Sequence, residues 1–88
     1  MKIREGFLLR SVGESYVVIP VGENSADFSN VITLNHSGAF VWNCLESDTT
    51  REEVIEKMLK EYDVSAEVAE RDLTRFVDML KANRLLEE

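Results

Sequence analysis

The pattern of apolar residues changes near Asn35, and this change constrains the fold more than any other feature of the sequence. Before Asn35, short runs rich in β-branched and aromatic residues alternate with turn residues, which predicts strands. After Asn35, apolar residues recur at spacings of three and four, which is typical of amphipathic helices. Strands followed by helices predict an α+β fold. We therefore expect one domain over residues 1–88, with a three-stranded antiparallel sheet followed by a three-helix bundle.

Three short segments account for the expected sheet. Residues 7–12 and 16–19 flank Gly13-Glu14-Ser15, a short glycine-containing loop that predicts a β-hairpin. Residues 31–34 form the third strand, after a polar loop at 22–30. In such a meander the third strand lies at an edge of the sheet, where its backbone N–H and C=O groups need a partner or water.

Capping residues mark the starts of the three expected helices. Asn35 can cap the first helix, and Ser65 can cap the third. Either residue of the pair Thr49-Thr50 can form a capping box with the Glu three positions later. The first helix is apolar nearly all round, so we expect it to be buried on several sides, with Trp42 in the core. The second helix is expected to run to about Tyr62, and its apolar positions form one narrow stripe: Val54, Ile55, Met58, Leu59 and Tyr62. The third helix is expected to end near Ala82, after which Leu85-Leu86 folds back onto the core.

The third helix has a wide apolar face. At about 100° per residue, its core stripe consists of Ala69, Leu73, Phe76, Val77 and Leu80. The flank on one side of this stripe carries Val68, Asp72, Arg75 and Met79. An ordinary wide core face accounts for this pattern. One wall of a binding groove accounts for it equally well, with Met79 as an adaptable contact and Asp72 and Arg75 as polar anchors.

The charge of the chain narrows the choice of partners. The net charge is −7. Residues 46–88 hold thirteen acidic and seven basic side chains and therefore contribute −6 of it. Proteins that bind duplex nucleic acids normally present a basic face to the phosphates. The helical half would instead repel anionic surfaces and suit cationic partners.

The residues that usually carry catalysis or bind metals are scarce. The chain has one Cys and one His, whereas a metal site needs several ligands at suitable spacing. Cys44 and His36 lie eight residues apart on one expected helix, about 12 Å along its axis, too far for a nucleophile–base pair. We therefore expect no enzyme activity, no metal and no cofactor. Cys44 is expected to be a buried, inert thiol, and the sequence carries no apparent signal peptide or membrane span, so we expect a cytoplasmic protein.

Several motifs around and after the strand-to-helix junction resemble the PqqD-like family. They are Leu34-Asn35, Gly38-Ala39, Val41-Trp42, Leu45, Thr50-x-x-Glu53-Val54-Ile55, Tyr62, Asp72, Phe76, Leu80 and Leu85-Leu86. The resemblance as a whole covers roughly residues 5–87. One departure is Asn83-Arg84, where the family often has a Gly near the last helical turn.

The resemblance implies a winged-helix-like fold and a function. Members of this family bind the leader segment of a ribosomally made precursor peptide and deliver it to a modifying enzyme, commonly a radical S-adenosylmethionine protein. An open sheet edge can accept such a peptide as an added strand, while a neighbouring helix supplies specificity. Arg75 would then meet a leader carboxylate, and Asp72 a basic or hydroxyl group. The expected peptide-binding residues are Val31, Ile32, Thr33, Val68, Asp72, Arg75 and Met79.

Two other functions fit the same sequence. Three helices and a small sheet also occur in winged-helix nucleic-acid binders, although the acidic charge disfavours that function. A structural or regulatory subunit could instead dock on an enzyme, or form a homodimer, through the apolar first helix and the Val17-Val18-Ile19 segment, which is apolar on both sides of its strand.

Overall fold

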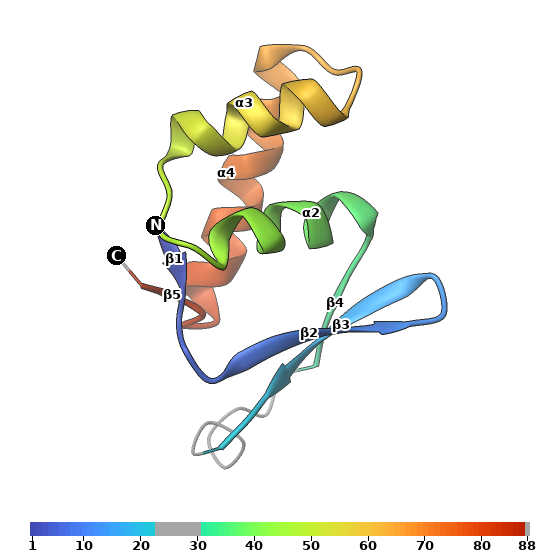
Figure 1. Ribbon diagram of the computed structural model, residues 1–88, viewed down its shortest axis with the longest axis vertical. Coiled ribbons are helices and arrows are strands. Elements are labelled where there is room, and N and C mark those ends of the chain that lie inside the picture. The colour runs from blue at the N-terminus through green and yellow to red at the C-terminus, as the bar shows by residue number, and fades with distance from the viewer. Residues whose placement is uncertain (23–30, 88) are drawn as a thin grey trace.

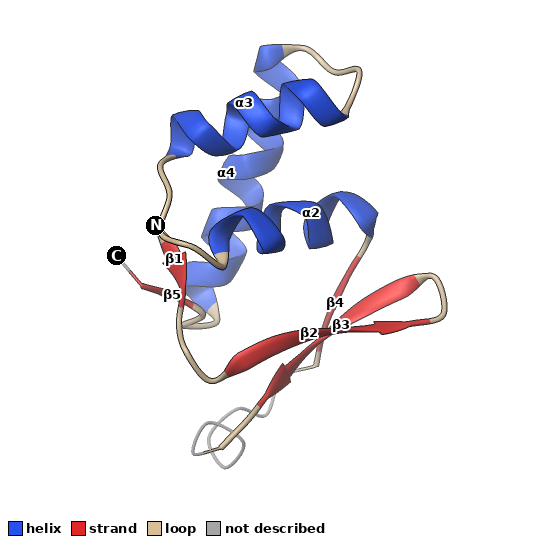
Figure 2. Cartoon of the chain, in the orientation of Figure 1, coloured by secondary structure: helices blue, strands red, loops and turns tan. Residues whose placement is uncertain are grey.

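The computed structural model describes residues 1–22 and 31–87, so most of the expected loop at 22–30 lies outside the described residues. A three-stranded antiparallel sheet has the order β2-β3-β4, and Figure 2 shows the described helices on one side of it. Its strands are β2 (Phe7–Val12), β3 (Ser15–Pro20) and β4 (Ile32–Leu34), and the helices are α2 (His36–Leu45), α3 (Arg51–Glu61) and α4 (Ala66–Ala82). The expected α+β class, with strands first and helices after them, is confirmed.

The β2–β3 hairpin is tighter than the sequence suggested. Val12 pairs with Ser15, so the loop contains only Gly13 and Glu14, and Ser15 belongs to β3. Gly13 has a φ of 62°, the left-handed conformation that glycine adopts without steric cost in such two-residue turns. The third strand is also shorter than expected, because it begins at Ile32 and leaves Val31 outside. Among the described strands β4 pairs only with β3, so it is an edge strand as expected.

A second, two-stranded sheet was not expected from the sequence. β1 (Lys2–Ile3) pairs antiparallel with β5 (Leu86–Glu87), with Ile3 opposite Leu86. The Arg4 backbone N–H extends the contact by donating to the Leu85 carbonyl at 2.8 Å. Figure 1 shows that this pairing brings the two ends of the described chain together. Leu85 is fully buried, which confirms that the segment after α4 folds back onto the core.

The core lies where the helices meet the sheet. Its largest fully buried side chains are Trp42, Leu45, Val54, Leu73, Leu80 and Leu85. Trp42 is only 1% exposed, as expected for the apolar first helix. Two expectations were too strong: Leu59, assigned to the apolar stripe of α3, is 40% exposed, and Cys44 is only half-buried. Leu59 follows Met58 directly in α3, so it points about 100° away from the core-facing direction.

Each described helix begins at a capping side chain. The Asn35 side-chain oxygen accepts from the Gly38 N–H at 2.9 Å, and the Ser65 hydroxyl accepts from the Val68 N–H at 3.2 Å. At the start of α3 the cap is Thr50, which accepts from the Glu53 N–H at 3.2 Å. Thr49 has another role, because its buried hydroxyl donates to the Glu53 carboxylate at 2.8 Å.

The end of α4 forms a compact C-terminal turn in which the described chain departs from the family pattern. The Arg84 N–H donates to the Lys81 carbonyl at 3.1 Å, and the Leu85 N–H donates to the Leu80 carbonyl at 2.8 Å. These two bonds define a Schellman motif, in which the residue after the cap is left-handed and usually Gly. Arg84 occupies that position with a φ of 58°.

Candidate functional site

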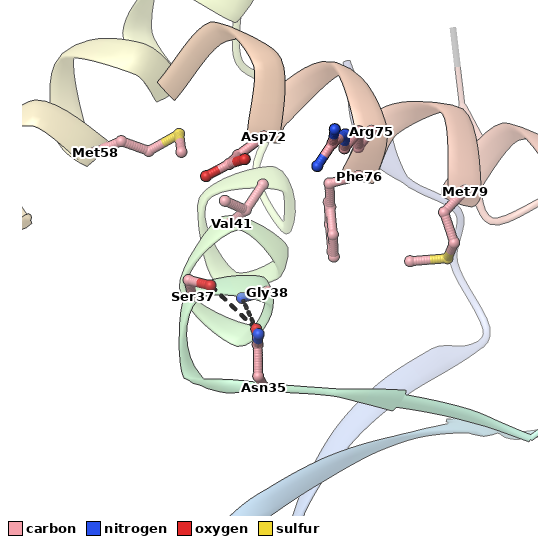
Figure 3. A pocket seen from close by; sticks show the side chains of 9 residues that line it. All are labelled: Asn35, Ser37, Gly38, Val41, Met58, Asp72, Arg75, Phe76 and Met79. Atoms are coloured by element: carbon pink, nitrogen blue, oxygen red, sulfur yellow. Dashed lines mark hydrogen bonds between the residues drawn. The ribbon is translucent and has the colours of Figure 1, made fainter. Parts of the chain in front are cut away.

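A pocket of about 370 Å³ opens where the N-terminal end of α2 meets α3 and α4. Its lining residues come from three helices and from the residue before α2 (Figure 3). They are Asn35, Ser37, Gly38, Val41, Met58, Asp72, Arg75, Phe76 and Met79. Because Asn35 directly follows β4, the pocket begins where the open edge of the sheet ends.

The first turn of α2 forms the base of the pocket. The Asn35 side-chain oxygen accepts from both the Gly38 N–H and the Ser37 hydroxyl, at 2.9 and 3.0 Å (Figure 3). A Cβ atom on Gly38 would lie 3.3 Å from the Leu34 Cβ and 3.5 Å from the edge of the Phe76 ring. A side chain at position 38 would therefore crowd Leu34 at the end of β4, whereas its contact with the Phe76 ring of α4 would be an ordinary van der Waals contact.

The walls of the pocket are mainly apolar. Val41 and Met58 belong to the buried core, whereas Phe76 and Met79 are half-buried and pack against that core from α4. Methionine side chains are flexible and polarisable, so Met58 and Met79 can adapt to ligands of different shape. Such a surface suits an apolar side chain of a bound molecule.

Two side chains of opposite charge line the same pocket. Asp72 and Arg75 lie three residues apart on α4, and both are exposed. Within residues 1–22 and 31–87, neither side chain takes part in a hydrogen bond or an ion pair. By contrast, Arg51 of α3 is paired with the carboxylate of Glu70 on α4 at 3.0 Å. Asp72 and Arg75 can therefore pair with charged groups of a ligand without breaking a contact within the described part of the chain.

The pocket contains part of the binding site expected from the sequence. Asp72, Arg75 and Met79 line it, but Val68 does not. Val68 is half-buried one turn before Asp72. Thr33 is exposed on β4, which leads directly into the pocket.

The other strand residues of the expected site lie beside the pocket. Val31 is 83% exposed and precedes β4. Ile32 packs against the core from β4, with its side chain half-buried.

Six lining residues were not recognised as site residues from the sequence. They are Asn35, Ser37, Gly38, Val41, Met58 and Phe76. Asn35 and Gly38 were identified only as a helix cap and part of a family motif, and Phe76 was assigned to the core stripe of α4. The motif itself was the available signal, because it places a cap and a glycine immediately after the edge strand.

The fold raises the pKa of two described groups, the Cys44 thiol and the Tyr62 phenol. Burial raises the pKa of the Cys44 thiol above its ordinary value, and the nearby positive charge of Lys57 only partly opposes this effect. Burial also raises the pKa of the Tyr62 phenol, with the negative charge of Glu61 adding to it. A thiol that stays protonated is a weak nucleophile. His36, the other candidate for nucleophile chemistry, packs its ring edge-on against Tyr16, with the ring centroids 5.6 Å apart.

The described residues contain neither a cluster of metal ligands nor a membrane-spanning helix. Within them, no three His, Cys, Asp or Glu side chains come close enough together to hold a metal ion. None of the helices in this part of the chain is both long enough and apolar enough to cross a bilayer.

The fold and the pocket define a small α+β module in which an open sheet edge adjoins a pocket with both apolar and charged walls. The chain belongs to the PqqD family, because the family model described as "Coenzyme PQQ synthesis protein D (PqqD)" matches residues 10–86. It is also similar to the solved structure of TbiB1 in complex with the TbiA(beta) leader peptide. The TM-score is 0.78 and the sequence identity 26%, over 99% of this chain and 95% of that one. No curated protein matches the sequence.

Proposed function

We propose that this chain is a non-catalytic recognition element that binds the leader segment of a ribosomally made precursor peptide. The observation that carries the proposal is the continuity between the open edge of β4 and the pocket that begins at Asn35. Family membership supports it, as does the similarity to TbiB1, whose solved structure contains a leader peptide.

The leader binds as an added strand along β4. Backbone groups of Val31, Ile32 and Thr33 pair with the leader backbone, because an unpaired strand edge is a template for another strand. Leader side chains that face α4 then contact Met79 and Val68. Arg75 pairs with a leader carboxylate, and Asp72 with a basic or hydroxyl group.

The bound leader is presented to a modifying enzyme, for which a radical S-adenosylmethionine protein is our candidate. Residues 1–88 act as one peptide-recognition domain without catalytic activity of their own. A reducing, cytoplasmic location suits both the single half-buried Cys44 and an iron–sulfur partner enzyme.

A binding experiment with selected peptides tests this proposal. Peptides are first enriched on the wild-type chain from a display library of random 15-residue sequences. The affinity of the enriched peptides is then measured for Arg75→Glu and Met79→Asp. Each change should weaken binding at least about tenfold, or about 1.4 kcal/mol. The matched control is Asp78→Ala, which changes an exposed residue of α4 outside the pocket and should leave the affinity unaltered. Glu70→Ala is a poorer control, because it breaks the contact with Arg51.

Backbone N-methylation distinguishes strand addition from side-chain docking. If an enriched peptide pairs with β4, methylation of alternate backbone nitrogens should abolish binding in one register and spare it in the other, since every second N–H of a strand faces its neighbour. Uniform tolerance to methylation would exclude strand addition. Failure to enrich any peptide would refute leader binding altogether.

The sheet supplies one observation in favour of a docking or homodimer role. Leu8 and Val12 lie on the same face of β2 and are 43% and 56% exposed. Their cross-strand neighbours include Ile19, opposite Leu8. Exposed apolar patches often mark protein contacts. Sedimentation of the wild type and of Leu8→Glu would reveal a dimer held through this face, because only the wild type would then associate.

A further inference from the structure

We infer that the peptide read by this site carries three side chains in a fixed order at alternate positions: basic, acidic and apolar. From the N-terminus the motif is Lys or Arg, any residue, Asp or Glu, any residue, and a large apolar residue. This inference rests on the proposed function and adds to it the sequence that the pocket selects.

The direction follows from the relative orientation of β4 and α4. β4 runs toward Asn35, and in Figures 1 and 3 it runs opposite to α4, along which Asp72, Arg75 and Met79 succeed one another. All strand pairs described in the sheet are antiparallel, and antiparallel pairing is slightly more stable per residue than parallel pairing. A peptide added antiparallel to β4 therefore runs in the direction of α4. Its N-terminal part lies near Asp72 and its C-terminal part near Met79.

The spacing follows from the geometry of helix and strand. Along α4, Arg75 lies about 4.5 Å beyond Asp72, and Met79 lies about 6 Å beyond Arg75. Along an extended peptide, side chains on one face recur about every 6.8 Å. Positions i, i+2 and i+4 of the peptide therefore face Asp72, Arg75 and Met79 in turn. The long Arg75 and Met79 side chains can absorb the remaining difference of about 3 Å over the whole motif.

The chemistry follows from the charges around the pocket. Asp72 and Arg75 supply the only charged side chains among the described lining residues, and neither is paired within the described chain. The chain is acidic overall, with a net charge of −7. A peptide carboxylate is consequently repelled by most of this surface and is favoured beside Arg75. A basic side chain is favoured beside Asp72, and Phe76 and Met79 provide apolar surface for the third position.

The test is a peptide selection carried out in parallel on three proteins. A display library of random 15-residue peptides is enriched on the wild type, on the double variant Asp72→Arg/Arg75→Asp and on Asp78→Arg. Asp78→Arg is the matched control, because it changes the charge of α4 outside the pocket. The wild type and the control should enrich the basic–acidic–apolar order. The double variant should enrich the acidic–basic–apolar order.

Synthetic peptides then give the size of the effect. Exchanging the two charges in an enriched peptide should weaken its binding to the wild type about tenfold, because two attractive exposed pairs become repulsive. The same exchange should strengthen binding to the double variant. The single variant Asp72→Asn should abolish only the preference for a basic residue at the first position of the peptide motif. Arg75→Gln should abolish only the preference for an acidic residue at the second. Melting curves of all variants verify that they are folded.

The selection distinguishes a failure of the peptide motif from a failure of peptide binding itself. Enrichment of peptides without a charge order, or of the same order on the wild type and the double variant, would overturn the motif but leave peptide binding intact. Enrichment of the reverse order along the chain, apolar first, would overturn the antiparallel direction. If no peptide is enriched on any of the three proteins, the motif and the proposed function both fail.

Discussion

The Leu85 backbone N–H donates to the Leu80 carbonyl across the turn that ends α4, at 2.8 Å, and both side chains are fully buried. The contact between these two leucines holds the chain in the turn that leads into β5. Arg84 lies between them in the left-handed conformation, which costs a non-glycine residue roughly 1–2 kcal/mol. The turn therefore forms although its central residue disfavours it.

We expect Arg84→Gly to stabilise the protein by about 0.5–1 kcal/mol. Glycine adopts the left-handed conformation without steric cost, and its greater freedom in the unfolded chain offsets only part of this gain. The hydrogen bond from the Arg4 guanidinium to residue 84 is retained, because its acceptor is the backbone carbonyl. Arg84→Val should destabilise, since β-branched residues are the least tolerated there. Urea unfolding of both variants checks this, and equal midpoints would contradict the account of the turn.

The Asn35 cap is expected to affect both stability and peptide binding, unlike the Thr50 cap. Asn35→Ala and Thr50→Ala should each cost about 0.5–2 kcal/mol, because each leaves a helix N-terminal N–H without its acceptor. Only Asn35 lines the pocket, so only Asn35→Ala should weaken the binding of enriched peptides. Thermal unfolding and fluorescence anisotropy measure the two effects. Equal affinities for the two variants would show that the cap does not contribute to the site.

Trp42 is expected to be a main contributor to stability. Trp42→Ala should destabilise by about 3–5 kcal/mol, the usual cost of removing a large aromatic side chain from a core. The free energy of unfolding of a protein is only about 5–15 kcal/mol in total, so Trp42→Ala could unfold the domain. Trp42→Phe provides a milder variant that should stay folded and lose less of this free energy. Denaturant midpoints that match the wild type in both variants would place Trp42 at the surface instead.

The raised pKa of Cys44 predicts a loss of stability at alkaline pH. An unfolded thiol deprotonates near its ordinary pKa of about 9.0, whereas the folded thiol does so at a higher pH. The contribution of Cys44 to the free energy of unfolding is therefore fully present below pH 9. It is lost as the pH rises through the pKa of the folded thiol. Cys44→Ala should flatten the decline that begins above pH 9, and Tyr62→Phe should flatten it at higher pH, because the pKa of Tyr62 is also raised. Unfolding free energies at several pH values measure this, and parallel profiles for wild type and variants would contradict it.

The main elements of the fold could be predicted from the sequence because each carries a strong local signal. The hairpin has a glycine-containing loop, and the helices have capping side chains and apolar stripes. β1 and β5 were missed, since two-residue strands have no periodicity and their partners lie at opposite ends of the chain. Leu59 was misassigned for a related reason: its position beside Met58 in the sequence did not reveal that only one of the two faces α4.

The candidate site could be predicted only in part. The flank of α4 was visible as a helical spacing, and it does bring Asp72, Arg75 and Met79 into one pocket. The opposite wall depends on how closely two helices approach, which no local pattern reports. Gly38 lies at this approach, where a Cβ atom would be in van der Waals contact with the Phe76 ring at 3.5 Å. The proposed use of Val31, Ile32, Thr33 and Val68 stays a prediction.

Because β1 pairs with β5, a protein fused to either end of this chain would be attached at the same place relative to the pocket. Both strands lie beside the C-terminal end of α2 (Figure 1), where the Thr49 N–H donates to the Met1 carbonyl at 3.0 Å. The pocket, by contrast, is lined by residues at the N-terminal end of α2. A helix of ten residues is about 15 Å long. A protein joined at either end of the chain would therefore be attached beside the β1–β5 pair. It would need a linker of about eight flexible residues to span the length of α2 and reach the pocket. It would then meet the bound peptide at an effective concentration in the millimolar range.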